Sequence, residues 1–238
     1  CVMLGGDVVL YLNDVLIELG DFSLRADLSV PAGRKVAIIG PSGAGKSTLV
    51  GAVAGFVPLA RGSVTMQGRD ITHAAPDQRG MAMLFQDGNL FPHLTAAQNV
   101  GLGLRPALRL TAQEQGQVRD ALARVGLAGF EDRTPANLSG GQQSRAALAR
   151  MLVQGKPLML LDEPFAALGP ALRDDMLDLV STVAADTGAA VLMVTHAPQD
   201  VRRFADDVIF VEGGEAHAPQ AAGALMDNPP PALKNYLG

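Results

Sequence analysis

The sequence has no tryptophan, two tyrosines and one cysteine among its 238 residues. A single cysteine excludes an internal disulfide framework and a multi-cysteine zinc site, and it suits a reducing compartment. Basic residues are also few, since 19 lysines and arginines oppose 24 acidic residues, for a formal net charge of -5. Because that balance implies no strongly basic surface, we expect no nucleic-acid partner.

Long hydrophobic runs are lacking as well. No apolar stretch reaches the ~18 residues that a transmembrane helix needs. The first cationic residue is Arg25, so the basic start of a signal peptide is missing. Hydrophobic residues nevertheless make up 48% of the chain. That content excludes intrinsic disorder, and we expect residues 1–238 to form a single domain with a sizeable core.

The pattern of apolar residues changes along the chain. Short β-type runs at 8–12, 27–30 and 35–39 come first. A mostly helical stretch follows at 90–155, in which Thr111 starts a capping box. Strands then alternate with helices, at 158–161, 170–187, 190–194, 198–205 and 208–211.

This order predicts an α/β fold. Alternating strands and helices form a parallel sheet with flanking helices. The early strands predict an N-terminal antiparallel β part. The helical stretch 90–155 is expected to be a subdomain inserted into this α/β core.

One glycine-rich segment matches the phosphate-binding pattern G-x-x-x-x-G-K-[ST]. It follows a predicted strand and precedes a helix-like run, which is the context that the pattern requires. Its backbone N–H groups can surround phosphate oxygens, the lysine neutralises the terminal phosphates, and the serine hydroxyl ligates Mg²⁺. The predicted nucleotide-binding residues are Gly40, Pro41, Ser42, Gly43, Ala44, Gly45, Lys46, Ser47 and Thr48.

Two acidic residues follow the predicted strand 158–161. Asp162 stands where a second oxygen ligand for Mg²⁺ is needed, beside the phosphate loop. Glu163 comes next and faces differently, so it can polarise an attacking water. The alternative for such an acid pair is an ordinary helix N-cap. These residues and the phosphate loop predict a P-loop NTPase core that binds a nucleotide together with Mg²⁺.

A second anion-binding segment lies within the helical stretch. Ser139, Gly140, Gly141 and Gln142 open a helix expected at about 140–154, whose first N–H groups favour negative charge. One chain cannot easily surround a single nucleotide with both segments. Two chains arranged head to tail can, so this segment is predicted to serve the partner's nucleotide in a homodimer.

Taken in order, these motifs resemble the ATP-binding subunits of ABC transporters over nearly the whole chain. The resemblance implies that Gln86 reaches the metal and the attacking water, and that His196 contacts the terminal phosphate. The predicted catalytic residues are thus Glu163, His196 and Gln86, and the predicted metal ligands are Ser47, Gln86 and Asp162. The segments 83–95, 98–104 and 177–182 are similar to the family's importers of thiamine or a related small solute.

The chain departs from its family at two positions. Members of the family usually carry an aromatic residue near the end of the first strand, where it stacks on adenine. In this chain Leu19 either occupies that place or belongs to the core. The loop 166–169 usually ends in an aspartate that couples the two nucleotide sites, and here it ends in Gly169. We therefore expect ATP hydrolysis with weak coupling between the two sites.

The resemblance also implies partners and a location. The segment 90–94, with His93, is expected to dock a membrane permease rather than merely pack at a helix start. A periplasmic substrate-binding protein would act indirectly, and the subunit would lie at the cytoplasmic face of the inner membrane as a peripheral protein. The alternatives are an ABC-type ATPase of DNA repair or translation and a regulator without catalysis. The sequence lacks the guanine-recognition motif N-K-x-D, which argues against a P-loop GTPase.

Overall fold

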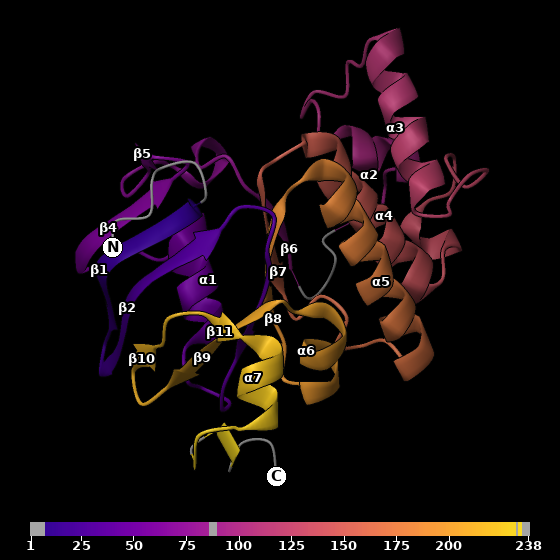
Figure 1. The fold of residues 1–238 in the computed structure, drawn as a ribbon. Coiled ribbons are helices and arrows are strands. Elements are labelled where there is room, and N and C mark those ends of the chain that lie inside the picture. Colours follow the sequence, from indigo (N-terminus) through magenta and orange to yellow (C-terminus); the bar gives the residue numbers. More distant parts are fainter. Residues whose placement is uncertain (1–7, 86–89, 232, 235–238) are drawn as a thin grey trace.

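The computed structural model describes residues 8–85, 90–231 and 233–234. One mixed sheet organises this part of the chain, in the order β5-β4-β1-β2-β10-β9-β3-β8-β7-β6, with β11 paired to β9. Helices cover its parallel portion, and the antiparallel strands stand at the other end (Figure 1). The predicted α/β class is confirmed, including the antiparallel part near the N-terminus.

The parallel strands are deeply buried. They read as nearly unbroken apolar runs because helices cover both faces. In β8, for example, every residue is buried. The parallel strands are β3 (Lys35–Ile39), β6 (Ala82–Leu84), β7 (Leu158–Asp162), β8 (Ala190–Val194) and β9 (Asp207–Glu212).

The first two antiparallel strands are longer than the sequence indicated. In the first of them, β1, the apolar alternation breaks at Asp14, which has φ 44°, and the register with β2 shifts between Leu12 and Val15. A bulge of this kind interrupts the two-residue period on which the prediction relied. The antiparallel part contains β1 (Val8–Leu19), β2 (Phe22–Pro31), β4 (Arg61–Met66) and β5 (Arg69–Asp70), and two short strands, β10 (Glu215–Ala216) and β11 (Gln220–Ala221), border β9.

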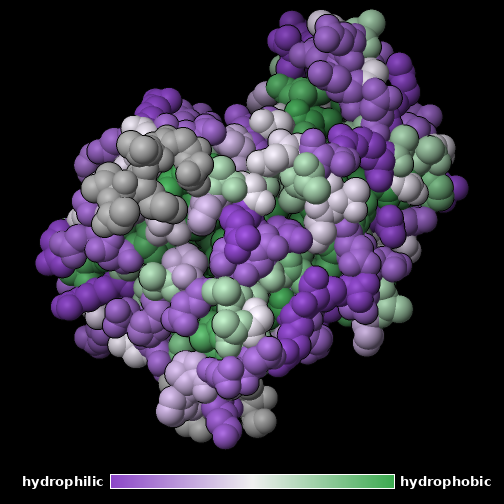
Figure 2. Space-filling view, in the orientation of Figure 1, coloured by the Kyte–Doolittle hydropathy of each residue, from purple (hydrophilic) through white to green (hydrophobic). Residues whose placement is uncertain are grey.

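The chain between β6 and β7 is mostly helical. Thr111 caps the second helix there through the predicted capping box with Glu114. The lobe around that helix stands out from the body of the molecule, with a mostly hydrophilic outer surface (Figure 2). The helices are α2 (Ala96–Gly101), α3 (Ala112–Arg124) and α4 (Gly140–Gln154), with a 3-10 turn, η2, at Pro135–Asn137.

The remaining helices pack on the sheet. The helix α1 lies between the antiparallel strands and the parallel strands, and α5 runs beside α4 (Figure 1). A glycine in the left-handed conformation, Gly188, ends α5, as the sequence predicted. These helices are α1 (Lys46–Ala54), α5 (Pro170–Thr187), α6 (Pro198–Phe204) and α7 (Ala222–Asp227), and a further 3-10 turn, η1, spans Pro76–Gln78.

Candidate nucleotide-binding site

The glycine-rich loop joins the end of β3 to α1. Gly40 has φ 152°, and a Cβ there would lie 2.0 Å from the backbone oxygen of Val211. Gly45 has φ 103°, and a Cβ there would lie 2.5 Å from the Phe22 ring. Side chains at either position would collide with their neighbours and strain the backbone. The two glycines therefore fix the path of a loop whose N–H groups can approach phosphate oxygens closely.

Lys46 opens α1 and is buried, which is rare for a lysine. Its Nζ donates hydrogen bonds to the backbone oxygens of Gly40 at 2.8 Å and Pro41 at 2.9 Å. Burial lowers the pKa of Lys46, while the nearby carboxylates of Glu163 and Asp162 act in the opposite direction. The ammonium is thus held inside the loop, where phosphates would replace the weaker carbonyl partners.

Ser47 and Asp162 meet beside the loop. The Ser47 hydroxyl donates to Oδ1 of Asp162 at 3.0 Å. Burial raises the pKa of Asp162, the hydrogen bond from Ser47 lowers it, and the charge of Glu163 raises it further. A half-buried carboxylate next to a hydroxyl is a hard oxygen donor set, which fits Mg²⁺ with its remaining ligands drawn from phosphate and water. Gln86, the third predicted ligand, lies outside the described residues.

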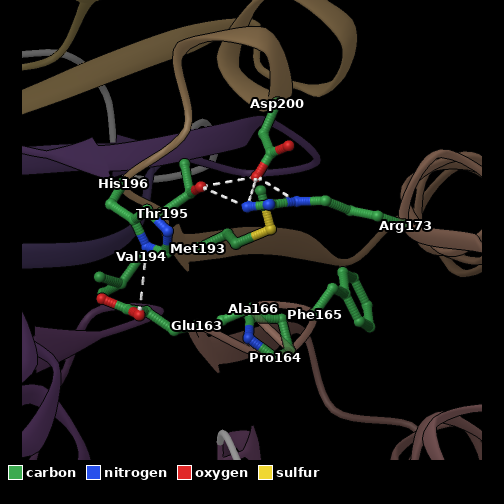
Figure 3. A pocket seen from close by; sticks show the side chains of 10 residues that line it. All are labelled: Glu163, Pro164, Phe165, Ala166, Arg173, Met193, Val194, Thr195, His196 and Asp200. Carbon is green, nitrogen blue, oxygen red and sulfur yellow. Dashed lines mark hydrogen bonds and ion pairs between the residues drawn. The ribbon is translucent and has the colours of Figure 1, made fainter. Parts of the chain in front are cut away.

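Glu163 occupies an unusual backbone position, with φ 47°. Its N–H donates to the backbone oxygen of Val194 at 3.2 Å, and its Oε2 lies 3.3 Å from Nδ1 of His196 (Figure 3). A positive φ in a non-glycine residue costs free energy and gathers at functional sites. The predicted acid and histidine are therefore brought together, and Glu163 lines the same cavity as Ser47.

A cavity of about 340 Å³ lies over the phosphate loop. Leu19 lines it and is 45% exposed, so the alternative that this side chain belongs to the core is wrong. The residue lies at the end of β1, where the chain turns into β2 and leaves its side chain over the loop. The cavity is lined by Leu19, Phe22, Ser42, Gly43, Gly45, Lys46, Ser47, Thr48 and Glu163.

The second predicted anion-binding segment lies at the start of α4, and none of its residues lines that cavity. Ser139 caps the helix, with its Oγ accepting from the Gln142 N–H at 3.3 Å, and Gln142 Oε1 accepts from the Ser139 N–H at 2.9 Å. Gly141 packs on Leu172 of α5, where a Cβ would lie 2.5 Å from a methyl group. The capped helix predicted at about 140–154 is confirmed.

Sequence reasoning missed three residues behind His196. Thr195, Asp200 and Arg173 form a buried network there. They come from the end of β8, from α6 and from α5, and no local pattern links residues so far apart. They could be recognised only from the burial of their charged side chains, and that burial is known only once the fold is known.

Strand, glycine-rich loop, helix and neighbouring acid define a P-loop nucleotide-binding protein. The family model described as "ABC transporter" matches residues 24–166. The chain belongs to this family, which confirms the resemblance seen in the sequence. Among the described residues, no helix is both long enough and apolar enough to span a membrane.

Curated relatives match nearly the whole chain. The chain is 57% identical to a protein of Cereibacter sphaeroides over 97% of its own length and 100% of that protein's length. It is 48% identical to a protein of Mesorhizobium japonicum, over 99% and 94% of the two lengths. Both relatives are named "Thiamine import ATP-binding protein ThiQ".

Solved structures share the fold. One is an ATP-binding cassette of an ABC transporter in its ADP conformation, with a TM-score of 0.84, 24% identity and coverage of 97% and 99% of the two chains. Another is a dimeric cassette in a post-hydrolysis state bound to ADP and Pi, with a TM-score of 0.75, 27% identity and coverage of 90% and 98%.

Proposed function

We propose that this protein binds and hydrolyses ATP as the energising subunit of an ABC importer for thiamine or a closely related solute. The observation that carries the hydrolytic part is the Glu163–His196 pair, which lies beside a loop built for phosphates and beside the Ser47–Asp162 oxygen pair. The cargo assignment rests on full-length relatives that carry the thiamine-import name.

Each predicted residue has a task in this proposal. The loop N–H groups and Lys46 hold the β- and γ-phosphates in place. Ser47 and Asp162, with Gln86, would hold Mg²⁺, which neutralises charge on the phosphates when bound. Glu163 accepts a proton from the attacking water at its carboxylate. His196 keeps that carboxylate in place and contacts the terminal phosphate.

A second copy of the chain completes each site in this proposal. The start of α4 does not reach its own cavity, and Ser139 lies exposed on the surface. A partner's nucleotide can meet it there, as a head-to-tail homodimer requires. A relative of known structure is dimeric in a post-hydrolysis state, which supports this arrangement. ATP then acts through its higher affinity for the closed dimer.

The permease contact is assigned to the segment 90–94. Phe91 is 48% exposed, although its backbone is fixed: Asn99, fully buried, donates to the oxygens of Phe91, Leu94 and Thr95 and accepts from the Phe91 N–H. A rigid loop that presents an aromatic ring suits a protein interface. It would seat a membrane permease at the cytoplasmic face of the inner membrane, with a periplasmic binding protein acting from the other side.

The test of hydrolysis is Glu163→Gln. The amide cannot accept the proton, so kcat should fall about 10²- to 10⁴-fold while ATP binding persists. Glu215→Gln is the matched control, because Glu215 also lies beside a histidine, His217, on the surface. ATP affinity by calorimetry and phosphate release are measured for both variants. Parent-like turnover in Glu163→Gln would remove the residue from the mechanism.

The test of cargo uses the assembled transporter. The protein is purified with its permease in lipid vesicles, and ATP hydrolysis is measured with thiamine and the binding protein present or absent. We expect thiamine to stimulate hydrolysis, and an unrelated vitamin not to do so. Hydrolysis that ignores thiamine, or a protein that captures no permease, would favour the alternative of an ABC-type ATPase without this transport role.

A further inference from the structure

A buried network lies directly behind the turn that carries His196. The Thr195 hydroxyl accepts a hydrogen bond from the Ala197 N–H at 3.1 Å and donates one to Oδ2 of Asp200 at 2.6 Å. A side-chain hydroxyl that bonds the backbone two residues on fixes a tight turn. His196 lies between Thr195 and Ala197, so this hydrogen bond fixes the backbone on both sides of the histidine.

The network extends to a second helix. Arg173 of α5 donates to the same Asp200 oxygen through Nη2 at 2.6 Å and Nε at 3.1 Å. Its side chain is 14% exposed and that of Asp200 is 4% exposed. We call Arg173, Asp200 and Thr195 the buried clasp. It joins the first turn of α5 to the turn that holds His196.

The geometry of the clasp is poor for stability alone. All three short bonds converge on Oδ2, and the other oxygen of Asp200, Oδ1, is buried without a hydrogen-bond partner in the described part of the chain. A buried polar atom without a partner is costly. Buried ion pairs are often no more stable than well-packed apolar residues of similar volume. A pair that leaves one oxygen unsatisfied is therefore better explained by what it holds in place.

We propose that the buried clasp positions His196 for hydrolysis and transmits to it the position of α5. This inference deepens the proposed function and rests on it. Arg173 and Asp200 line the same small pocket as Glu163 and His196 (Figure 3). The segment 164–169 runs from Glu163 to the start of α5, and a shift of this segment reaches His196 through Arg173. Arg173, Asp200 and Thr195 are positioning residues and touch no reacting atom.

The test removes the ion pair without leaving a buried charge. Arg173→Met with Asp200→Asn keeps the shapes and keeps an oxygen for the Thr195 hydroxyl. The matched control is Arg203→Met with Asp178→Asn. Arg203 and Asp178 also join α6 to α5, with Nη2 and Oδ2 2.5 Å apart, but their side chains are 41% and 60% exposed. Thermal midpoint, ATP affinity, kcat, and amide exchange over residues 195–200 are measured for both.

For the clasp variant we expect a midpoint and an ATP affinity close to the parent's. We expect kcat to fall about tenfold or more, because a small displacement of a catalytic group has effects of that order. Amide exchange over 195–200 should be several-fold faster. The control should match the parent in kcat and exchange. A fall in kcat without a change in ATP affinity is not what a purely structural pair would give.

The inference is overturned if the clasp variant keeps the parent's kcat, whether or not exchange changes. If that variant does not fold, Thr195→Val decides, since it leaves the ion pair intact and removes only the hydroxyl that anchors the turn. A parent-like kcat in Thr195→Val then overturns the inference. A parent protein that hydrolyses no ATP would instead refute the proposed function, and unchanged exchange over 195–200 would still refute the clasp.

Discussion

Two helices of this molecule begin beside glycines, but their N-termini are capped differently. The start of α1 has Gly45 as its N-cap, with no side chain to cap the helix. The start of α4 has Ser139, which closes a complete capping box with Gln142. The first N–H groups of a helix have no partner within the helix. At α1 they are left for a ligand, whereas at α4 one of them already has a side-chain partner.

The difference shows which end is built to hold phosphate by itself. The α1 end has a shaped loop, a buried lysine and a carboxylate within reach. The α4 end offers only a capped helix on the surface, so an anion there must compete with the Ser139 hydroxyl. We infer that α1 supplies affinity for the nucleotide, and that α4 responds to a partner only when the dimer closes.

The largest expected effect comes from removing Lys46, because the N-terminus of α1 then loses its advantage over that of α4 in binding phosphate. In Lys46→Ala the phosphates lose a charged donor, and bonds to charged groups are worth about 1.5–3 kcal/mol, so ATP affinity should fall about ten- to hundredfold. Isothermal calorimetry gives the affinity. Lys156→Ala makes the same charge change away from the loop and should bind ATP like the parent. Equal affinity in the two variants would contradict the phosphate-binding role of Lys46.

Asp162→Asn tests the role of the carboxylate near the N-terminus of α1, because activity and stability should change in opposite directions. The amide still accepts from Ser47, but it is a poor Mg²⁺ ligand, so stimulation of hydrolysis by Mg²⁺ should fall about tenfold or more. Without Mg²⁺ the variant should be more stable at neutral pH, since burial raises the pKa of Asp162 and penalises its charged form.

The sign of the pH dependence follows from that raised pKa. The contribution of Asp162 to stability is fully present below its unfolded pKa and is lost as pH rises through the higher folded pKa. The advantage of Asp162→Asn should therefore appear as pH rises and vanish in acid. Melting temperatures across this range, with Asp120→Asn as an exposed control, measure it. An advantage that is greatest in acid would contradict the assignment of the shift.

Ser139→Ala tests the α4 side against a matched helix. Thr111 makes the same capping box on α3, far in sequence from both nucleotide motifs. Each substitution to alanine should cost about 1 kcal/mol of stability. Only Ser139→Ala should also reduce turnover at saturating ATP in the dimer. Chemical denaturation and steady-state kinetics of both variants give the answer, and parallel losses of activity would reduce Ser139 to a simple cap.

Gly169→Asp should have the smallest effect on stability. Gly169 is the N-cap of α5 with φ −66°, and a Cβ there meets nothing within 4 Å, so its backbone does not require glycine. Aspartate should add a few tenths of a kcal/mol as a cap. We also expect a higher Hill coefficient for ATP hydrolysis in the permease complex, because the family resemblance implies that an aspartate at this position couples the two nucleotide sites. An unchanged Hill coefficient and rate would make Gly169 a neutral change.

Local pattern accounts for much of the site. The phosphate loop and the acids after β7 could be predicted because each depends on residues adjacent in sequence, and the structure places Ser47 against Asp162 as expected. The length of β1 could not, since the bulge at Asp14 breaks its apolar alternation. The location of the Leu19 side chain could not be predicted either, because a leucine is equally suited to a core and to the rim of a cavity.

The sequence by itself determined the alternation of strands and helices after residue 157, the α/β class and the family, because periodicity and compact motifs are properties of short segments. Only the tertiary structure decided which side chains meet across those segments. Arg173 and Asp200 lie on separate helices, and Thr195 looks like an ordinary strand end. The clasp they form depends on how α5 and α6 pack on β8, and the residues next to them in the sequence do not indicate that packing.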